Sequence, residues 1–407
     1  MAFRVVLIEN EVTIKVKLNN LIVTKEGEDI WIPLDDISMI VLDNLSSMLS
    51  ARLLCQLSEQ GIGLMICNQK HLPTGYYSSY DNHSRASKVI GYQIEKSKEY
   101  YEQLWKDIVT VKIQNQSKAY LRLTSDQEGT RVIKEFSSEI INGDQSNREA
   151  HAAKVYFNLL MGTSFSRGNE DILLNSGLDY GYAVLRGYIA RVCVGYGLNT
   201  QIGIHHKNEY NRFNLVDDLM EPLRPMIDIV AYESMKNEEY FTAEHRRQLV
   251  NILNMKILYR NKKMFVCNMI ENYVEQFAYL IMERCENIVF PDIDGFIGEK
   301  LDYKIMRMLC MFDLPVETDE ERRSYRIFRK NLIQEGFVMM QYSVYVRVCP
   351  SREYANRLEK RIKKFIPREG NVRLLCVTEK QYSDMKLLVG SQSVAEAAIG
   401  TERLIIL

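Results

Sequence analysis

Residues 303–349 read "YKIMRMLCMFDLPVETDEERRSYRIFRKNLIQEGFVMMQYSVYVRVC". The apolar run that ends at Asp313 predicts a buried strand, and the proline after it predicts a turn. Thr318 followed by acidic residues is typical of a helix start, and Gly336 is typical of a helix end. The apolar segment after Gly336 predicts another strand region. The stretch therefore predicts a strand, a helix and one or two further strands.

The same pattern continues downstream. "SREYANRLEKRIKKFI" (351–366) predicts a second helix, and "NVRLLCVT" (371–378) predicts a last strand. Strand–helix–strands–helix–strand within about 75 residues is the ferredoxin-like pattern, an α/β sandwich that we assign to residues 301–407. The apolar tail "RLIIL" (403–407) is expected to add a strand to a sheet edge or to dock on the upstream part of the chain.

Upstream, two regions of different pattern precede this unit. "RVVLIEN", "VTIKVKLNN", "LIVTKEG" and "DIWIPLDDISMIVLD" predict strands, interrupted by a helix from about residue 46 to Gln60, so residues 1–80 are expected to be an N-terminal β-domain. Residues 81–290 carry helical spacing, as in "NREAHAAKVYFNLLMG" and "DYGYAVLRGYIARVCVGYG", and predict an all-α domain. Residues 291–300 are expected to be a linker. The fold class is therefore a multidomain α+β protein.

The composition is that of an ordinary globular protein. The 407 residues are 46% hydrophobic and 26% charged, and eight cysteines are scattered without a CxxC pair. This cysteine usage favours reduced thiols in a cytosolic protein over a disulfide frame or a zinc site. The apolar runs are too short to cross a bilayer, and no signal peptide is expected.

The net charge of −1 conceals an asymmetry. Residues 300–407 hold 20 Lys and Arg against 14 Asp and Glu, whereas the rest of the chain holds 32 against 39. Net charge therefore gives no global sign of nucleic-acid binding, and a local basic surface is expected in the C-terminal quarter.

Two adjacent histidines, His205 and His206, precede a segment with several acidic residues. Asp218 and Glu221 are three residues apart, which places both on one face of a helix. Glu149 lies near the start of another expected helix. Carboxylates and imidazole suit Mg²⁺ or Mn²⁺, but acidic residues near helix ends also serve as solvated or dipole-complementing groups. These residues alone leave a metal site and an ordinary polar helix end as alternatives.

The order of the motifs resembles a known family over about residues 1–290. "NREAHAAKVYFNLLMG", "FSRG", "LDYGYAVLRGYIARVCVGYGLNTQIGIHH" and "FNLVDDLMEPLRPMID" follow one another as in the CRISPR adaptation integrase of the type II-A branch, which inserts new spacers into CRISPR arrays. The resemblance implies an N-terminal β-domain followed by a helical catalytic domain.

The resemblance also implies the catalytic residues. In the family a Glu, a His and a final acid hold a divalent metal, here Glu149, His206 and Glu221, with Asp218 as an accessory carboxylate and Mg²⁺ or Mn²⁺ as the ion. The family histidine closes a Gly-apolar-apolar-His segment fifteen residues before the acid, which selects His206. Because this chain has His where the third position is normally apolar, His205 remains the alternative.

The implied reaction is a transesterification in which the 3′-hydroxyl of a short DNA duplex attacks a phosphodiester at the leader–repeat boundary. The implied partners are double-stranded DNA, as prespacer and leader–repeat, and further copies of the chain through integrase dimers. A type II effector nuclease and an accessory ring protein that binds DNA ends belong to the same expectation. The expected location is the prokaryotic cytoplasm, with no membrane partner.

The C-terminal unit resembles the small ferredoxin-like subunit of the same adaptation machinery, through "MFDLP" and "EGFVMMQYSVY". In the family this subunit dimerises and bridges integrase dimers, so the chain is expected to be a natural or engineered fusion. Arg322, Arg326 and Arg329 recur on one helix face and are expected to contact DNA phosphates, the alternative being a solvated face. Asp313 matches an acid that binds metal in some members.

The sequence leaves three candidate functions. The first is a metal-dependent DNA integrase that works as an oligomer. The second is a metal-dependent nuclease acting on branched or free DNA with the same residues. The third is a non-catalytic scaffold that binds DNA, which the presence of Glu149, His206 and Glu221 disfavours because a scaffold needs none of them.

Overall fold

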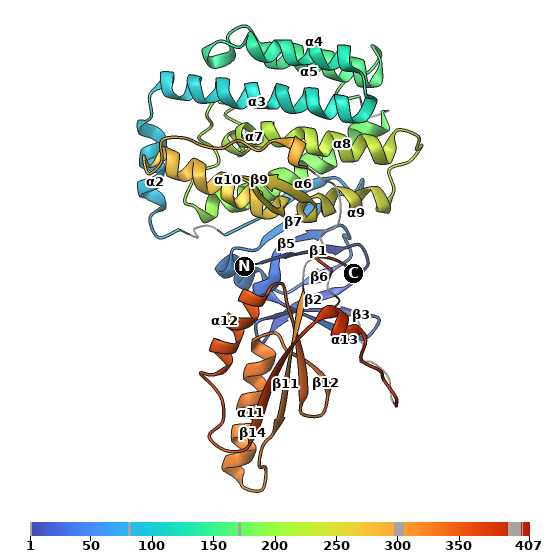
Figure 1. Ribbon diagram of the computed structural model, residues 1–407, viewed down its shortest axis with the longest axis vertical. Helices are drawn as coiled ribbons and strands as arrows, with labels where there is room; N and C mark the ends of the chain where they lie inside the picture. Colours follow the sequence, from blue (N-terminus) through green and yellow to red (C-terminus); the bar gives the residue numbers. More distant parts are fainter. Residues whose placement is uncertain (1, 80–82, 170–171, 297–304, 390–399, 401) are drawn as a thin grey trace. The chain divides into compact units, whose positions relative to one another are not determined.

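The computed structural model describes residues 2–79, 83–169, 172–296, 305–389, 400 and 402–407. The chain is a mixed α+β protein with an N-terminal β region, a helical middle and a small C-terminal α/β unit, which confirms the predicted fold class (Figure 1). Two compact units form. The first combines Met1–Ile62 with Asp302–Leu407, and the second is Gly63–Leu301.

The N-terminal part of the first unit contains two sheets. In one, β1 pairs in parallel with both β5 and the C-terminal strand β15 (Leu404–Ile406), and in the other the strand order is β4-β3-β2-β6. Helix α1 begins after Ser50, whose side chain accepts a hydrogen bond from the Leu53 amide, and ends at Gly61 in the left-handed conformation. The elements of this part are β1 (Arg4–Ile8), β2 (Thr13–Lys17), β3 (Asn20–Lys25), β4 (Glu28–Pro33), β5 (Ile37–Leu42), β6 (Met48–Leu49) and α1 (Ala51–Gln60).

The C-terminal part of the first unit is the predicted ferredoxin-like sandwich. Its antiparallel sheet has the order β12-β13-β11-β14, and α11 and α12 bury Phe328, Leu332 and Leu358 in a core shared with that sheet. The Thr318 capping box begins α11, because its side chain and that of Glu321 satisfy each other's backbone amides. The elements are β11 (Met306–Asp313), α11 (Asp319–Gln334), β12 (Val338–Gln341), β13 (Val344–Cys349), α12 (Arg352–Ile362), β14 (Asn371–Thr378) and α13 (Glu379–Ser383).

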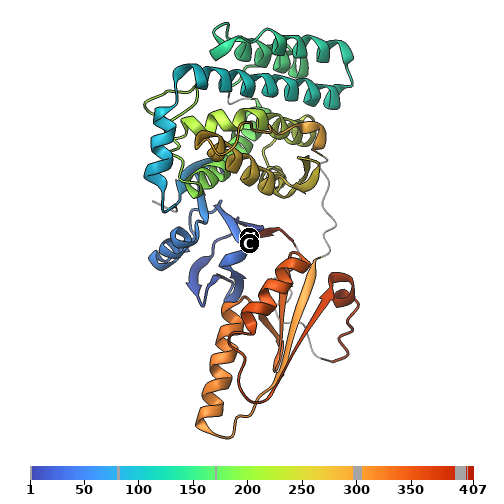
Figure 2. The same ribbon diagram turned by 60° about the vertical axis from the view of Figure 1, so that its left-hand side comes forward.

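The C-terminal tail and a buried ion pair join these two parts of the first unit. Strand β15 (Leu404–Ile406) lies beside β1, which confirms that the apolar tail adds a strand to a sheet edge (Figure 2). Arg347 on β13 donates two hydrogen bonds to the carboxylate of Asp36, at 2.5 and 2.6 Å, and both side chains are fully buried. Because this ion pair is buried and makes two aligned hydrogen bonds, it fixes how β13 lies against the segment that carries Asp36.

The second unit is mainly helical, as expected. Gly181 on α6 allows close helix packing, since a Cβ there would lie 2.5 Å from Ile227. The elements are the β7–β8 hairpin (Gly63–Cys67, Pro73–Tyr77), α2 (Ala86–Glu95), α3 (Lys98–Thr124), α4 (Gln127–Glu135), α5 (Arg148–Met161), α6 (Leu173–Gly195), α7 (Asn214–Met220), η4 (Glu221–Leu223), α8 (Arg224–Met235), α9 (Ala243–Asn251), the β9–β10 hairpin (Lys256–Tyr259, Lys262–Phe265) and α10 (Val266–Ile281).

Some predicted boundaries differ from the observed ones. The helix expected from residue 46 begins at Ala51, because residues 48–49 form β6 beside β2. The domain limits at residues 80 and 290 stay predictions, and the end of the predicted linker at residues 297–300 lies outside the described residues. Within the described part of the chain, no helix is both long and apolar enough to cross a membrane.

Candidate active site

Asp218 on α7 holds the histidine segment in place. Its carboxylate is fully buried and accepts hydrogen bonds from the amides of Ile204 and His205, at 2.6 and 2.9 Å, and from the amide of His206 at 3.3 Å. These hydrogen bonds fix the backbone of residues 204–206 against α7. Gly203 permits this approach, because a Cβ there would lie 2.3 Å from the carbonyl oxygen of His206.

The two histidine rings have different surroundings. The Nδ1 of His206 lies 2.5 Å from a carboxylate oxygen of Asp218, and this hydrogen bond raises the pKa of His206. The ring of His205 instead stacks on Trp105, with centroids 4.4 Å apart and planes 3° from parallel. A carboxylate on one ring nitrogen orients the other nitrogen for metal binding in many metalloproteins. This arrangement favours His206 over His205 as a ligand.

Glu149 and Glu221 meet at one ammonium group. Lys112 on α3 lies 2.5 Å from Oε1 of Glu149 and forms an ion pair with Oε2 of Glu221. Lys112 and Glu221 are buried, and Glu149 is about one quarter exposed with a side-chain exposure of 26%. The structure thus brings two of the predicted ligands, which are 72 positions apart on the chain, to a common cation.

The charges around Lys112, Glu149 and Glu221 shift the pKa values of Glu221 and Lys112. Burial alone would raise the pKa of Glu221, but the positive charges of Arg224 and Lys112 outweigh it and lower the pKa to about 2. Burial alone would lower the pKa of Lys112, yet Glu221 and Glu149 raise it. Both groups therefore remain charged at neutral pH. The attraction between them is strong because the site is buried.

Neighbouring side chains fix the segment that carries Glu221. Asn115, one turn after Lys112 on α3, donates hydrogen bonds to the carbonyl oxygens of Pro222 and Pro291, at 2.8 and 2.9 Å. Arg224 donates to Oε1 of Glu221 at 2.9 Å and lies over the ring of Tyr182. Glu149 lies in the first turn of α5. Its backbone amide donates a hydrogen bond of 3.0 Å to the carboxylate of Asp144.

The donor set fits a hard divalent cation. Two carboxylates and an oriented imidazole are ligands that Mn²⁺ accepts and Mg²⁺ partly accepts. Oε2 of Glu221 is buried and has no aligned hydrogen bond, and its charge is compensated by Lys112 together with Arg224. Within the described ranges, no group of three or more His, Cys, Asp or Glu side chains is already arranged to hold a metal. The set of Glu149, His206 and Glu221 therefore remains a prediction.

Sequence reasoning missed Lys112, Trp105 and Asn115. A signal existed, because a lysine at position 112 continues the helical spacing of the buried Leu104 and Ile108. A charged residue on the buried face of a helix requires a partner, and the partner here is the carboxylate pair.

The predicted residues of the C-terminal unit lie apart from this cluster in sequence and are exposed. Arg322 donates to the carbonyl oxygens of Val316 and Glu317, and Arg329 donates to the hydroxyl of Tyr345 at 2.8 Å. Arg326 is exposed on the same helix, and Asp313 is exposed at the end of β11. Their roles in DNA and metal binding remain predictions.

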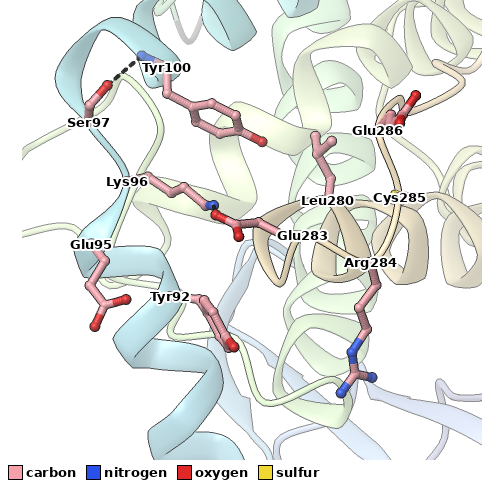
Figure 3. A pocket seen from close by; sticks show the side chains of 10 residues that line it. All are labelled: Tyr92, Glu95, Lys96, Ser97, Tyr100, Leu280, Glu283, Arg284, Cys285 and Glu286. Atoms are coloured by element: carbon pink, nitrogen blue, oxygen red, sulfur yellow. Dashed lines mark hydrogen bonds and ion pairs between the residues drawn. The ribbon is translucent and has the colours of Figure 1, made fainter.

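A separate groove of about 790 Å³ opens where α2 and the start of α3 face the end of α10. Figure 3 shows Tyr92 and Tyr100 on one side and Arg284 on the other, with Lys96 paired to Glu283 at 2.6 Å. Its lining mixes acidic, basic and aromatic side chains. It contains none of the residues predicted for the active site.

Comparison with protein families gives two matches in one chain. The family described as CRISPR associated protein Cas1 matches residues 5–261, and CRISPR associated protein Cas2 matches residues 306–385. A curated relative, the CRISPR-associated endonuclease Cas1 of Neisseria meningitidis serogroup C (strain 8013), is 32% identical over 72% of this chain and 97% of its own length. The CRISPR-associated endoribonuclease Cas2 of Ligilactobacillus salivarius (strain UCC118) is 57% identical over 25% of this chain and 100% of its own length.

Solved structures share the fold of the larger part. A casposase bound to integration product matches with a TM-score of 0.59 and 18% identity, over 74% of this chain and 96% of that one. A Cas1 protein from Thermotoga maritima matches with a TM-score of 0.54 and 16% identity, over 69% of this chain and 97% of that one. Taken with the family matches, these findings show that the chain belongs to the Cas1 family and carries a Cas2 domain at its C-terminal end, as a Cas1–Cas2 fusion.

Proposed function

We propose that this fusion catalyses spacer acquisition, joining short prespacer DNA into a CRISPR array by metal-dependent transesterification. The observation that carries the proposal is the meeting of Glu149 and Glu221 at one cation, beside a histidine oriented by a buried carboxylate. Membership of the Cas1 family gives this cluster its expected role. A solved structure with the same fold, a casposase bound to integration product, supports a joining reaction.

The chemistry requires a phosphodiester held in line with a 3′-hydroxyl. A bond forms between the attacking 3′-oxygen and phosphorus, the bond to the leaving 3′-oxygen breaks, and the hydroxyl proton is transferred to the leaving oxygen or to water. A divalent ion, when bound, supplies Lewis-acid stabilisation of both oxygens. Glu149, His206 and Glu221 would hold this ion, and Asp218 would keep the His206 ring in register through the hydrogen bond to Nδ1.

The Cas2 domain supplies the assembly in this proposal. It dimerises, bridges pairs of Cas1 parts, and contacts DNA phosphates through Arg322, Arg326 and Arg329, while Asp313 is a secondary metal-binding candidate. The domain limits at residues 80, 290 and 300 belong to the same proposal. Its setting is the prokaryotic cytoplasm, where a type II effector nuclease and a DNA-end-binding ring protein would be the further partners.

A joining assay separates this function from its alternatives. The protein is incubated with a supercoiled plasmid that carries a CRISPR array and with short duplexes that end in 3′-OH or 3′-deoxy, in Mg²⁺ or Mn²⁺. We expect joined product only with 3′-OH ends and only with metal. Cutting that ignores the duplex ends would support a general metal-dependent nuclease instead. Tight binding without joining or cutting would support a scaffold.

A further inference from the structure

The family resemblance did not lead us to expect Lys112 beside the two predicted carboxylate ligands. Its ammonium contacts the carboxylates of Glu149 and Glu221 together, from a side chain that is 6% exposed. Lysine is rarely buried unless it is paired. Both partners are residues that the proposed function assigns to the metal. Lys112 and the metal would therefore bind the same two carboxylates.

The two cations would compete for the same carboxylates. Mg²⁺ binds oxygen ligands at about 2.0–2.1 Å, and the Lys112 ammonium lies 2.5 Å from Oε1 of Glu149 and forms an ion pair with Oε2 of Glu221. A metal held by Glu149 and Glu221 would therefore compete with the Lys112 ammonium for these carboxylates. Like charges at such separations also repel strongly in a buried site.

We propose that the Lys112 ammonium occupies the metal position between Glu149 and Glu221 as an internal counter-ion, and that a divalent cation binds only by displacing it. The inference rests on the proposed function for the identity of the ligands. It deepens that function, because it makes metal binding depend on a residue of the protein itself. Without a cation, the two carboxylates would repel each other across a site in which Oε2 of Glu221 lacks an aligned hydrogen bond.

The displaced ammonium needs another anion. Asp218 cannot serve, since its oxygens already accept three amides and the His206 ring. Glu221 retains Arg224 as a cationic partner at 2.9 Å, so it stays compensated when Lys112 leaves. The anion that the proposed function brings to the site is a DNA phosphate. Displacement therefore couples metal binding to DNA binding, because the phosphate stabilises the lysine in its displaced position.

Metal affinity without catalysis tests the displacement. Binding of Mn²⁺ is titrated by the electron paramagnetic resonance signal of the free ion, for the wild type, Lys112→Gln and Lys112→Arg, with Lys118→Gln as the matched control on the same helix. Lys118 pairs with Asp292 and Asp294, away from the two ligands. We expect Lys112→Gln to bind Mn²⁺ at least about fivefold more tightly than the wild type, a typical size for coupling between two ligands. Lys112→Arg and the control should show no gain.

Addition of a short duplex tests the coupling. The duplex should raise the Mn²⁺ affinity of the wild type by a larger factor than that of Lys112→Gln. Only the wild type has an ammonium group that can move from the carboxylates to the DNA phosphate. An equal factor in both proteins would overturn the transfer. An unchanged or weaker Mn²⁺ affinity in Lys112→Gln would overturn the displacement itself.

A second measurement avoids substitution, in case Lys112→Gln fails to fold. Lysines of the wild-type protein are acetylated briefly with and without Mn²⁺, and the modified sites are quantified by mass spectrometry. We expect Lys112 to become several times more reactive with Mn²⁺, while Lys118 is unchanged. An unchanged Lys112 rate would contradict the displacement.

The variant Glu221→Gln distinguishes this inference from the proposed function. If Glu221→Gln loses Mn²⁺ and Lys112→Gln binds it like the wild type, the metal site stands and the displacement fails. If Glu221→Gln binds Mn²⁺ like the wild type, the assignment of Glu221 as a metal ligand is wrong, and the displacement proposal is wrong with it.

Discussion

Asp218 combines two tasks at the residue scale. Its buried carboxylate accepts the amides of residues 204–206 and also binds Nδ1 of His206, so the backbone and the ring are fixed by one group. A histidine held in this way presents its other nitrogen with little loss of side-chain freedom. His205 is held instead by stacking on Trp105.

The two histidines should therefore differ in function. His206→Ala is expected to reduce DNA joining by at least about 100-fold, as for the loss of a metal ligand, while DNA binding remains. His205→Ala should reduce joining by less than about tenfold, because it removes a ring stack and no ligand. Joining yields under identical conditions measure both. A His205→Ala protein that fails to join while His206→Ala joins normally would reverse the assignment.

Asp228 gives a prediction about pH. Burial raises the pKa of Asp228 to about 6, against about 3.9 for an unfolded chain. Between these values the native protein holds a proton that the unfolded chain has lost. The free energy of unfolding should therefore fall by about 2 to 3 kcal/mol from this group as pH rises from 4 to above 6.

The variant Asp228→Asn keeps the side chain's shape and removes the titration. It should lack this part of the pH dependence, whereas Glu238→Gln, at an exposed position, should retain it. Urea unfolding at pH 4, 5 and 7, followed by the fluorescence of Trp105 in a Trp31→Phe background, measures the difference. Parallel pH profiles for the wild type and Asp228→Asn would contradict the prediction.

At the scale of single elements, helix α11 tests the DNA surface. The plot of log DNA affinity against log salt concentration has a negative slope. Arg326→Gln should make this slope less steep by about 0.9, the value for one phosphate contact. Arg323→Gln is the matched control, since Arg323 is exposed on the same helix outside the row of Arg322, Arg326 and Arg329. Equal slopes in the two variants would favour a merely solvated face.

The elements that the sequence predicted well carry local signals. The ferredoxin-like unit was predictable because Thr318, Gly336 and the apolar runs mark its boundaries within each segment. Within the region predicted to be helical, α3 begins after Ser97, whose side chain caps it. The run at residues 29–43 divides between two sheets at the short 3-10 turn Leu34–Asp36, where the buried carboxylate of Asp36 binds Arg347, 311 positions away. Such long-range partners leave no local pattern.

The candidate site was predictable to a similar extent. Glu149 and Glu221 could be named from motif order, and the structure brings them to one ammonium. Lys112 could not be placed there by periodicity alone, because the spacing shows a helix face but not what that face contacts. The choice of His206 followed from the motif spacing that the family resemblance implies, and the contact with Asp218 adds a physical reason for it.

At the scale of the whole molecule, the ion pair of Asp36 and Arg347 holds distant parts of the first unit together. Asp36→Ala should destabilise that unit by about 3 to 5 kcal/mol, because Arg347 would be left buried without its partner. Asp35→Ala, at the neighbouring exposed position, is the control and should cost less than about 1 kcal/mol. Urea unfolding followed by Trp31 fluorescence in a Trp105→Phe background compares them. Equal stabilities would show that the pair contributes little.

The central claim is that residues from three separate segments form one metal-dependent site for DNA joining. The most direct measurement is the yield of joined plasmid product for Glu149→Gln, His206→Ala and Glu221→Gln, with Glu283→Gln in the separate groove as control. The account predicts loss of joining by at least about 100-fold in each of the first three, with DNA binding retained, and a normal yield for the control. A wild-type yield from any one of the three would contradict it.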